Sequence, residues 1–245
     1  MRSRHMIARS TEVVNNDFED LYLAVRQREK RLYTDEQLCR LPDIDSLHIY
    51  AEEWKIRKRS STRLIEYLRK KRRAMRILEV GCGNGWLSAK LSEIPGADVI
   101  GLDINQTEIS QANRVFIKDN LEFVYDTFNE DTFPEIKFDV IVFAASLQYF
   151  ESAKMILDLA LSILDADGEV HIIDTHFYKR EEISKANERT RNYYNSLGFP
   201  QMAEHYFHHV MEELSELKHH ILLNPDSMLS LLVKKGPFHW ITVNQ

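Results

Sequence analysis

The chain of 245 residues is 44% hydrophobic and 29% charged, with 8 Gly and 6 Pro, which excludes disordered and fibrous classes and fits one globular domain with a helical extension. Its two cysteines, Cys39 and Cys82, are too few for a disulfide framework or a cysteine-rich zinc site, so we expect a cytoplasmic protein. The net charge is -6, but residues 55–76 hold eleven Lys or Arg against one acid, Glu66. Such a basic run is more often the solvated side of a helix than a nucleic-acid face.

The first part of the chain, residues 1–74, is predicted to form an N-terminal helical extension. Residues 17–74 contain no glycine, and apolar residues recur at helical spacing, as at Leu64, Ile65 and Leu68. We expect the helices to be interrupted near Pro42. The first residues lack the apolar core of a secretory signal, and the apolar run 140–147 is far shorter than the roughly 20 residues that span a bilayer. We therefore expect no membrane span.

From residue 75 onward, short apolar runs alternate with segments of helical length. Strands are predicted at 75–80, 97–102, 121–125, 138–144 and 169–174. Helical spacing occurs at 86–93, 108–118 and 153–164, and Asp-Ala-Asp-Gly at 165–168 predicts a turn before the fifth strand. This alternation indicates a doubly wound α/β fold with a mostly parallel, Rossmann-like sheet over residues 75–245.

After Asp174 the composition and the apolar pattern of the sequence change. Residues 180–217 are polar, rich in aromatic residues and helical in pattern, and two more strands are predicted at 219–223 and 238–243. The last two strands are expected to form an antiparallel edge, which makes seven strands in all. Because long connections at the carboxyl edge of such a sheet usually serve function, we expect residues 177–217, approximately, to be a helical lid inserted in the second domain.

The segment RILEVGCGNGW, residues 76–86, places three glycines at alternate positions directly after a predicted strand. A strand that runs into a glycine-rich turn and a helix brings backbone N–H groups to the carboxyl edge of the sheet, where ligands bind. The spacing of Gly81, Gly83 and Gly85, followed by the bulky Trp86, differs from the G-x-G-x-x-G pattern that holds a pyrophosphate. A nicotinamide dinucleotide is therefore disfavoured.

These residues resemble a known family. LEVGCGNGWLSAKL with VIGLDIN is similar to the first motif and the next acidic strand end of the class I S-adenosylmethionine (SAM)-dependent methyltransferases. FVYDTFNEDTF and FDVIVFAASLQYF are similar to the third and fourth strands of that family with the segments that follow them. The resemblance covers roughly residues 75–175 and implies a methyltransferase of the small-molecule branch with SAM as cofactor.

The resemblance also implies site residues. SAM has a zwitterionic methionine end, a ribose diol and an adenine, but no phosphate. Carboxylates can bind its ammonium group and its ribose hydroxyls, so a phosphate-binding loop is not needed. Glu79 is implied near the ammonium group, Asp103 at the ribose hydroxyls and Asp126 at the adenine amine. The other implied cofactor contacts are Gly81, Cys82, Gly83, Asn84 and Gly85 along the methionine moiety, Ile104 and Thr127 beside adenine, and Phe143 and Ala144 under the methionine portion.

The acceptor side carries no signature motif. SLQYF has Gln148 and Tyr149 where many small-molecule members have a Leu-His-His-type segment, so a histidine role there is in doubt and Tyr149 is kept as a candidate catalytic residue. His176, beyond the fifth strand, is the candidate base, although a lone loop histidine is more often simply solvated. The histidines at 205, 208 and 209 lack an acidic ligand pattern, so no metal is expected.

The aromatic density of the expected lid favours an acceptor that is at least partly apolar, with Tyr178, Tyr193 and Tyr194 as candidate contacts. Half or more of these aromatic residues could equally be core. The favoured function is methylation of a small molecule or of a glycan or lipid-linked intermediate. Two alternatives stay open: a SAM-binding protein without catalysis, and an RNA methyltransferase that uses the basic face 55–76. The absence of an NPPY or DPPY motif makes a nucleic-acid partner unlikely. Oligomeric state is left open.

Overall fold

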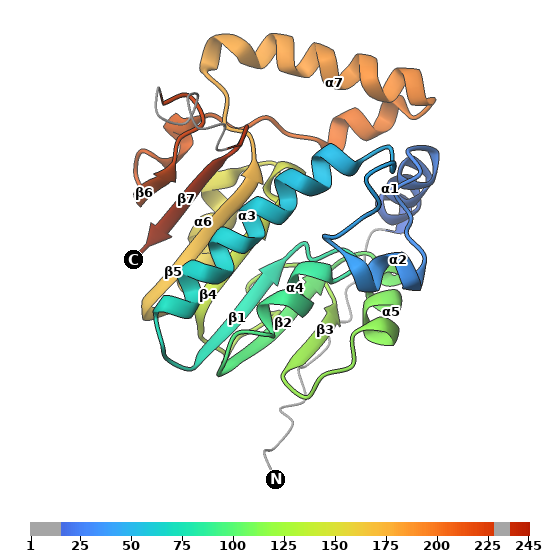
Figure 1. Ribbon diagram of the computed structural model, residues 1–245. Helices are drawn as coiled ribbons and strands as arrows, with labels where there is room; N and C mark the ends of the chain where they lie inside the picture. Colours follow the sequence, from blue (N-terminus) through green and yellow to red (C-terminus); the bar gives the residue numbers. More distant parts are fainter. Residues whose placement is uncertain (1–15, 228–235) are drawn as a thin grey trace.

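The computed structural model describes residues 16–227 and 236–245 (Figure 1). A seven-stranded sheet forms its centre in the order β3-β2-β1-β4-β5-β7-β6. Strands β1 to β5 pair in parallel, whereas β7 is antiparallel to both of its neighbours. The strands are β1 Met75–Val80, β2 Ala97–Asp103, β3 Leu121–Tyr125, β4 Phe138–Ala144, β5 Leu164–Thr175, β6 Lys218–Leu223 and β7 His239–Asn244. The predicted doubly wound, mostly parallel seven-stranded sheet with an antiparallel edge is confirmed.

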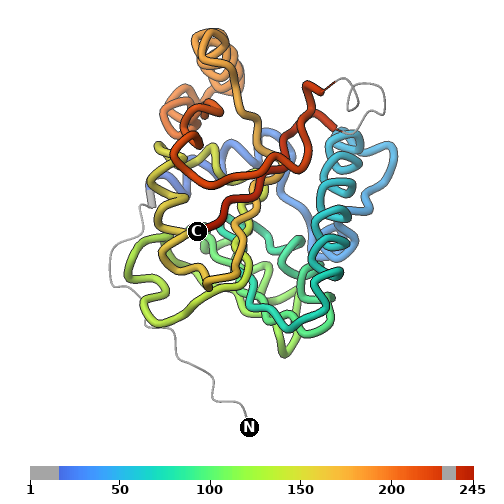
Figure 2. The backbone as a smooth tube through the Cα atoms, turned by 90° about the vertical axis from the view of Figure 1, so that its left-hand side faces the viewer, coloured from blue at the N-terminus to red at the C-terminus, as the bar shows by residue number. Residues whose placement is uncertain are grey.

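Helices cover both faces of the sheet, and Figure 2 shows α3 and α6 on opposite sides of the strands. The helices are α1 Asn16–Arg28, α2 Asp35–Arg40, α3 Ala51–Lys70, α4 Trp86–Leu91, α5 Gln106–Val115, α6 Ala153–Ser162 and α7 Ile183–Leu197. Because successive side chains of a strand point to opposite faces, the apolar runs of the central strands feed two separate cores. Ile77 packs with α3 and α4, and the next residue, Leu78, packs with α6.

Helix α3 of the expected N-terminal extension lies directly against the sheet. Its buried residues Trp54, Leu64 and Leu68 belong to the same apolar cluster as Ile77 and Val140 of the central strands. The extension and the rest of the chain thus share a core. The division of the chain at residue 74 stays a prediction.

Two local predictions are corrected by the structure. Residues 165–168 do not form a turn before β5, because β5 already begins at Leu164 and its pairing with β4 shifts register between Leu164 and Glu169. Glycine is common at β-bulges as well as in turns, so the segment suits either structure. The helical stretch 180–217 is also broken, because α7 ends at Leu197, where Gly198 adopts φ 86°, and only short 3₁₀ segments follow.

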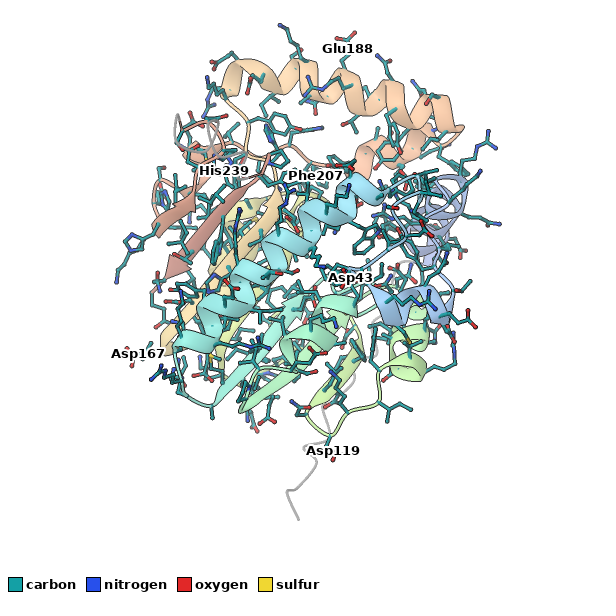
Figure 3. All side chains as sticks on the ribbon, viewed as in Figure 1. Asp43, Asp119, Asp167, Glu188, Phe207 and His239 are labelled. Carbon is teal, nitrogen blue, oxygen red and sulfur yellow. The ribbon has the colours of Figure 1, made fainter. Side chains whose placement is uncertain are left out.

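The connection from β5 to β6 lies beyond the carboxyl ends of the parallel strands. Both views show α7 crossing above this edge of the sheet (Figures 1 and 2). In Figure 3, Phe207 lies beneath α7, whereas Asp119 and Asp167 mark the opposite edge. Among the helices of the described ranges, none combines the length and the apolar character needed to cross a membrane.

Candidate functional site

A cavity of about 140 Å³, called here the cofactor cavity, opens at the carboxyl ends of β1, β2 and β4. Open α/β sheets bind their ligands at this edge. The lining residues are Phe18, Glu19, Tyr22, Val80, Gly81, Gly83, Leu102, Asp103, Ile104, Asn105, Asp126, Phe128, Ala145, Ser146, Tyr149 and Phe150. Five of the residues implied by the sequence motifs therefore meet in one cavity: Gly81, Gly83, Asp103, Ile104 and Asp126.

The glycine-rich turn after β1 forms one wall of the cavity. Gly81, Gly83 and Gly85 all have positive φ, between 54° and 76°, which a residue with a side chain adopts only with strain. A Cβ atom at Gly81 would lie 2.5 Å from the Cβ of Ser146, and one at Gly85 would lie 2.3 Å from the ring of Phe123. The turn therefore offers bare backbone to the cavity, as a ligand that passes close to the chain requires.

Asp103 ends β2 and is fixed by the backbone of that turn. Its Oδ2 accepts the N–H of Gly83 at 2.7 Å, and its Oδ1 accepts the N–H of Asn105 at 2.8 Å. Burial raises the pKa of Asp103 despite these hydrogen bonds. Asp126, at the end of β3, is buried and accepts the N–H of Thr127 at 2.8 Å. Two ordered carboxyl groups thus face the same end of the cavity, which suits the hydroxyl and amine donors of a nucleoside.

The remaining cofactor residues implied by the motifs lie outside the lining of this cavity. Glu79 is buried behind the glycine turn, where it accepts the hydroxyl of Ser88, and burial raises its pKa to about 8. Cys82 is buried, which raises its thiol pKa well above the usual value and is consistent with a packing role. Phe143 is fully buried in the core. The others that do not line it are Asn84, Gly85, Thr127 and Ala144. Their contacts with a cofactor stay predictions.

Helix α1 contributes three lining residues that were not among the site residues predicted from the sequence: Phe18, Glu19 and Tyr22. Glu19 is buried, and its Oε1 accepts the N–H of Gln106 at 2.7 Å at the start of α5. The spacing of Phe18 and Tyr22 marks one face of a helix, but nothing local shows that this face meets the glycine turn more than fifty residues later.

The nucleoside end of the cavity is acidic. Besides Asp103 and Glu19, the carboxyl group of Glu108 lies close to the turn, because a Cβ at Gly83 would be 3.2 Å from its Oε2. Burial, followed by the charge of Asp103, raises the pKa of Glu108 to about 7. Within the described residues, no group of three or more His, Cys, Asp or Glu is arranged to hold a metal ion.

Tyr149 closes the other end of the cavity. Its hydroxyl oxygen accepts a hydrogen bond from Nη2 of Arg26 at 3.2 Å. Its ring lies edge-on to Phe18, Tyr22 and Tyr206, with centroid distances of 6.4, 5.8 and 5.8 Å. Tyr149 is therefore held by residues from α1 and from the connection after α7.

The candidate base His176 lies elsewhere. It is exposed at the end of β5 and does not line the cofactor cavity. Its ring contacts Tyr178 at 4.2 Å, and Tyr178 contacts His208 at 5.1 Å. His208 and Tyr206, at 5.3 Å, complete a row of rings that leads back to Tyr149. The structure thus places the two candidate catalytic residues, His176 and Tyr149, at opposite ends of a row of five rings.

The two tyrosines of α7 differ in their surroundings. Tyr194 is buried in an apolar cluster with Val25 of α1 and Met202. Tyr193 is 44% exposed, and its hydroxyl donates to Glu29, just beyond α1. Neither lines the cofactor cavity.

A second, polar cavity of about 290 Å³ lies between α7 and the return loop 203–209. Its lining is Glu151, Ile183, Asn187, Thr190, Arg191, Ala203, Tyr206, Phe207, His208, His209 and Glu213. Tyr206 of its lining contacts Tyr149 of the cofactor cavity, so the two cavities are neighbours. The segment after β5 is rich in aromatic residues, but the cavity beside it is lined largely by groups that can form hydrogen bonds.

Comparison with known proteins agrees with this geometry. The profile of a family described as a methyltransferase domain matches residues 71–227. Malonyl-[acyl-carrier protein] O-methyltransferase 2 of Ilyobacter polytropus is 29% identical over 140 residues, which cover 55% of this chain and 54% of that protein. The ubiquinone biosynthesis O-methyltransferase of Nitrosococcus oceani is 31% identical over 98 residues, which cover 39% and 41%. The chain matches about half the length of these curated relatives.

A solved structure, the magnesium protoporphyrin IX methyltransferase of Synechocystis PCC 6803 with bound S-adenosylhomocysteine (SAH), superimposes with a TM-score of 0.58 at 14% identity and covers 95% of this chain and 98% of that one. At this identity the likeness shows the fold alone. The family profile spans more than half of the chain and contains the glycine turn, Asp103 and Asp126. The chain therefore belongs to the class I SAM-dependent methyltransferases.

Proposed function

We propose that the protein transfers the methyl group of SAM to a small molecule, or to a glycan or lipid-linked intermediate, in the cytoplasm. The observation that carries this proposal is the cofactor cavity, whose acidic nucleoside end and bare glycine turn lie at the carboxyl ends of the parallel strands. Relatives named for a malonyl-[acyl-carrier protein] and for ubiquinone biosynthesis support an acceptor that is small or carrier-linked.

The residues present fit the cofactor. In this proposal Asp103 accepts the ribose hydroxyls, Asp126 accepts the adenine amine, and Ile104 packs against the adenine ring. Gly81 and Gly83 let the methionine end pass beside the backbone, where any side chain at Gly81 would collide with Ser146. When bound, SAM supplies a methyl group on a positively charged sulfur. The protein contributes alignment of the acceptor with that sulfur, which can supply much of the rate of a displacement reaction.

We infer that the acceptor approaches past Tyr149 from the polar cavity. Amide, hydroxyl and guanidinium groups of Asn187, Thr190 and Arg191 offer hydrogen bonds to a polar acceptor. Burial lowers the pKa of His208 to about 4, so its imidazole is neutral at pH 7. His176 and Tyr149 remain the candidate catalytic residues, and Tyr178, Tyr193 and Tyr194 the candidate acceptor contacts.

The basic segment 55–76 offers no specific observation in favour of RNA. Most of it lies on α3 and its continuation, and several of its cations are paired with carboxylates. These pairs are Lys55 with Glu52, Arg57 with Glu53, Lys58 with Asp43, Lys71 with Glu169 and Arg73 with Asp139. Pairing reduces the charge available for phosphate contacts, so the RNA reading is not proposed as a second function.

The test is methyl transfer from SAM carrying a labelled methyl group. Purified protein is incubated with a small-molecule extract of the source cells, and in a second arm with their RNA. We expect label in the small-molecule fraction, and much less label there with the Asp103→Ala variant. Label confined to RNA, or SAM binding without transfer to either fraction, would overturn the proposal.

A further inference from the structure

Arg26 of α1 contacts two residues that line the cofactor cavity, Tyr22 and Tyr149, and its hydrogen bond goes to Tyr149. It is absent from the cavity lining, yet its Nη2 is 3.2 Å from the Tyr149 hydroxyl, which is at the cavity wall. A guanidinium has only donors and stays charged, so the Tyr149 oxygen is the acceptor in this contact. The proton of Tyr149 must then point away from Arg26.

Arg26 itself is firmly placed. Its Nη1 is 3.1 Å from Oε2 of Glu29, and its guanidinium lies over the ring of Tyr22 at 4.7 Å. Arg31 also approaches Glu29, at 3.4 Å, and continues to Glu53 at 2.6 Å. A chain of alternating charges therefore fixes the position of Arg26 from the side remote from the cavity.

Tyr149 is fixed as well. The two residues just before it are tied to the return loop, because the N–H of Phe207 donates to the carbonyl of Gln148 at 2.8 Å and Nε2 of His209 lies 3.0 Å from the carbonyl of Leu147. Together with the three rings around it, these bonds leave the Tyr149 hydroxyl little freedom to move. Within residues 16–227 and 236–245, no group accepts its proton.

We propose that Arg26 is a positioning residue that fixes the Tyr149 hydroxyl as a hydrogen-bond donor to an anionic oxygen of the bound ligand. Asp103, Asp126 and Glu19 line the nucleoside end, and Tyr149 lies at the other end beside Ser146. An anionic oxygen is favoured at Tyr149 because a donor backed by a guanidinium makes a charge-assisted hydrogen bond. Tyr149 is then a donor and not the base of the reaction.

Two ligands can supply such an oxygen: the methionine carboxylate of SAM, and an anionic group on the acceptor. Calorimetry distinguishes them with SAH and with 5′-methylthioadenosine, which has the same nucleoside but no amino-acid end. The variants are Tyr149→Phe, Arg26→Met, Arg26→Lys and the double variant Tyr149→Phe with Arg26→Met. Tyr67→Phe is the matched control, because it removes a tyrosine hydroxyl that donates to a carboxylate, that of Glu169 at 3.1 Å, and Tyr67 lines neither the cofactor cavity nor the polar cavity.

If the oxygen belongs to the cofactor, Tyr149→Phe and Arg26→Met each weaken SAH binding by roughly ten- to a hundredfold, the range of one charge-assisted hydrogen bond. Binding of 5′-methylthioadenosine stays within about twofold. The double variant is no weaker than either single variant, because both remove the same interaction. Arg26→Lys retains most of the affinity, and Tyr67→Phe is unchanged.

If the oxygen belongs to the acceptor, SAH and 5′-methylthioadenosine bind normally to every variant. The KM for the acceptor in the labelled extract fraction then rises in Tyr149→Phe and in Arg26→Met, and it rises no further in the double variant. The KM measurement rests on the proposed function, whereas the calorimetry does not. Additive effects of the two single variants overturn the proposal. Equal weakening of both nucleosides by Tyr149→Phe, with an unchanged midpoint of thermal unfolding, overturns it as well.

Discussion

The two ends of the cofactor cavity are built in different ways. The nucleoside end is formed mainly by strand ends and the glycine turn, and its central carboxylate, Asp103, is held by backbone N–H groups of Gly83 and Asn105. The Tyr149 end is formed by side chains from three distant segments: α1, the loop after β4 and the return loop after α7. One end is specified by backbone geometry, and the other by packing. Substitutions should therefore affect them in different ways.

The largest effect is expected at the glycine turn. Gly81→Ala adds left-handed strain of about 1–2 kcal/mol and a collision with Ser146 that costs about 1–3 kcal/mol more. We expect SAH affinity to fall by at least about thirtyfold, as measured by calorimetry. The matched control is Gly198→Ala, which has φ 86° but no atom within 4 Å of the new Cβ. If both variants bind SAH equally, the turn is not a contact surface.

At the packed end, Tyr194→Ala should lower the free energy of unfolding by about 3 kcal/mol, as is usual for a buried aromatic residue. Tyr193→Ala should change it by less than about 1 kcal/mol, because that side chain is 44% exposed. Urea unfolding of both variants measures the difference. We expect SAM affinity of Tyr193→Ala to stay within about twofold while turnover on the acceptor falls. Loss of SAM binding by Tyr193→Ala would make α7 part of the cofactor site.

Asp103→Ala tests the nucleoside end without changing the backbone of the turn. Loss of a buried acceptor of two hydroxyl groups should weaken SAH binding by about 1.5–3 kcal/mol, or roughly ten- to a hundredfold. Asp119→Ala, at the opposite edge of the sheet, is the control and should bind normally. Unchanged affinity of Asp103→Ala in calorimetry would rule out the ribose assignment.

The last prediction concerns the pH dependence of stability. Burial raises the pKa of Glu79 from 4.5 to about 8, so between these values the folded state binds more protons than the unfolded state. Stability therefore falls as pH rises through this window, by at most about 1.4 kcal/mol per pH unit for one group. Glu79→Gln should reduce the slope of unfolding free energy against pH between pH 5 and 8. Part of the slope should remain in this variant, because Glu108 and Asp174 also have raised pKa values, of about 7 and 6. An unchanged slope would show that Glu79 is ionised when buried.

The same difference between the two ends explains what the sequence could predict. Asp103 and the glycines are recognisable because their roles depend on neighbours within a few residues, namely a strand end and a turn with positive φ. Phe18 and Tyr22 were missed because any amphipathic helix has such a face, and only tertiary packing decides what it covers. For the same reason, Tyr149 was identifiable as a candidate but its partner Arg26 was not.

Local chemistry also has more than one solution. Asp-Ala-Asp-Gly at 165–168 is compatible with a turn and with a β-bulge. Pairing of this segment's strand with β4 selects the irregular strand over the turn. In the expected lid, Gly198 and Pro200 follow Leu197 closely and are helix-ending signals, which the aromatic pattern of 180–217 obscured.

The carboxylate of Glu19 holds three elements at once. It belongs to α1, accepts N–H groups of Gln106 and Thr107 at the start of α5, and accepts the Tyr125 hydroxyl at the end of β3. The first amides of α5 are thus protected from solvent only while α1 is docked. Their hydrogen-exchange rates should report how often α1 lifts from the cavity, and so set an upper limit on how quickly nucleoside can leave through that side.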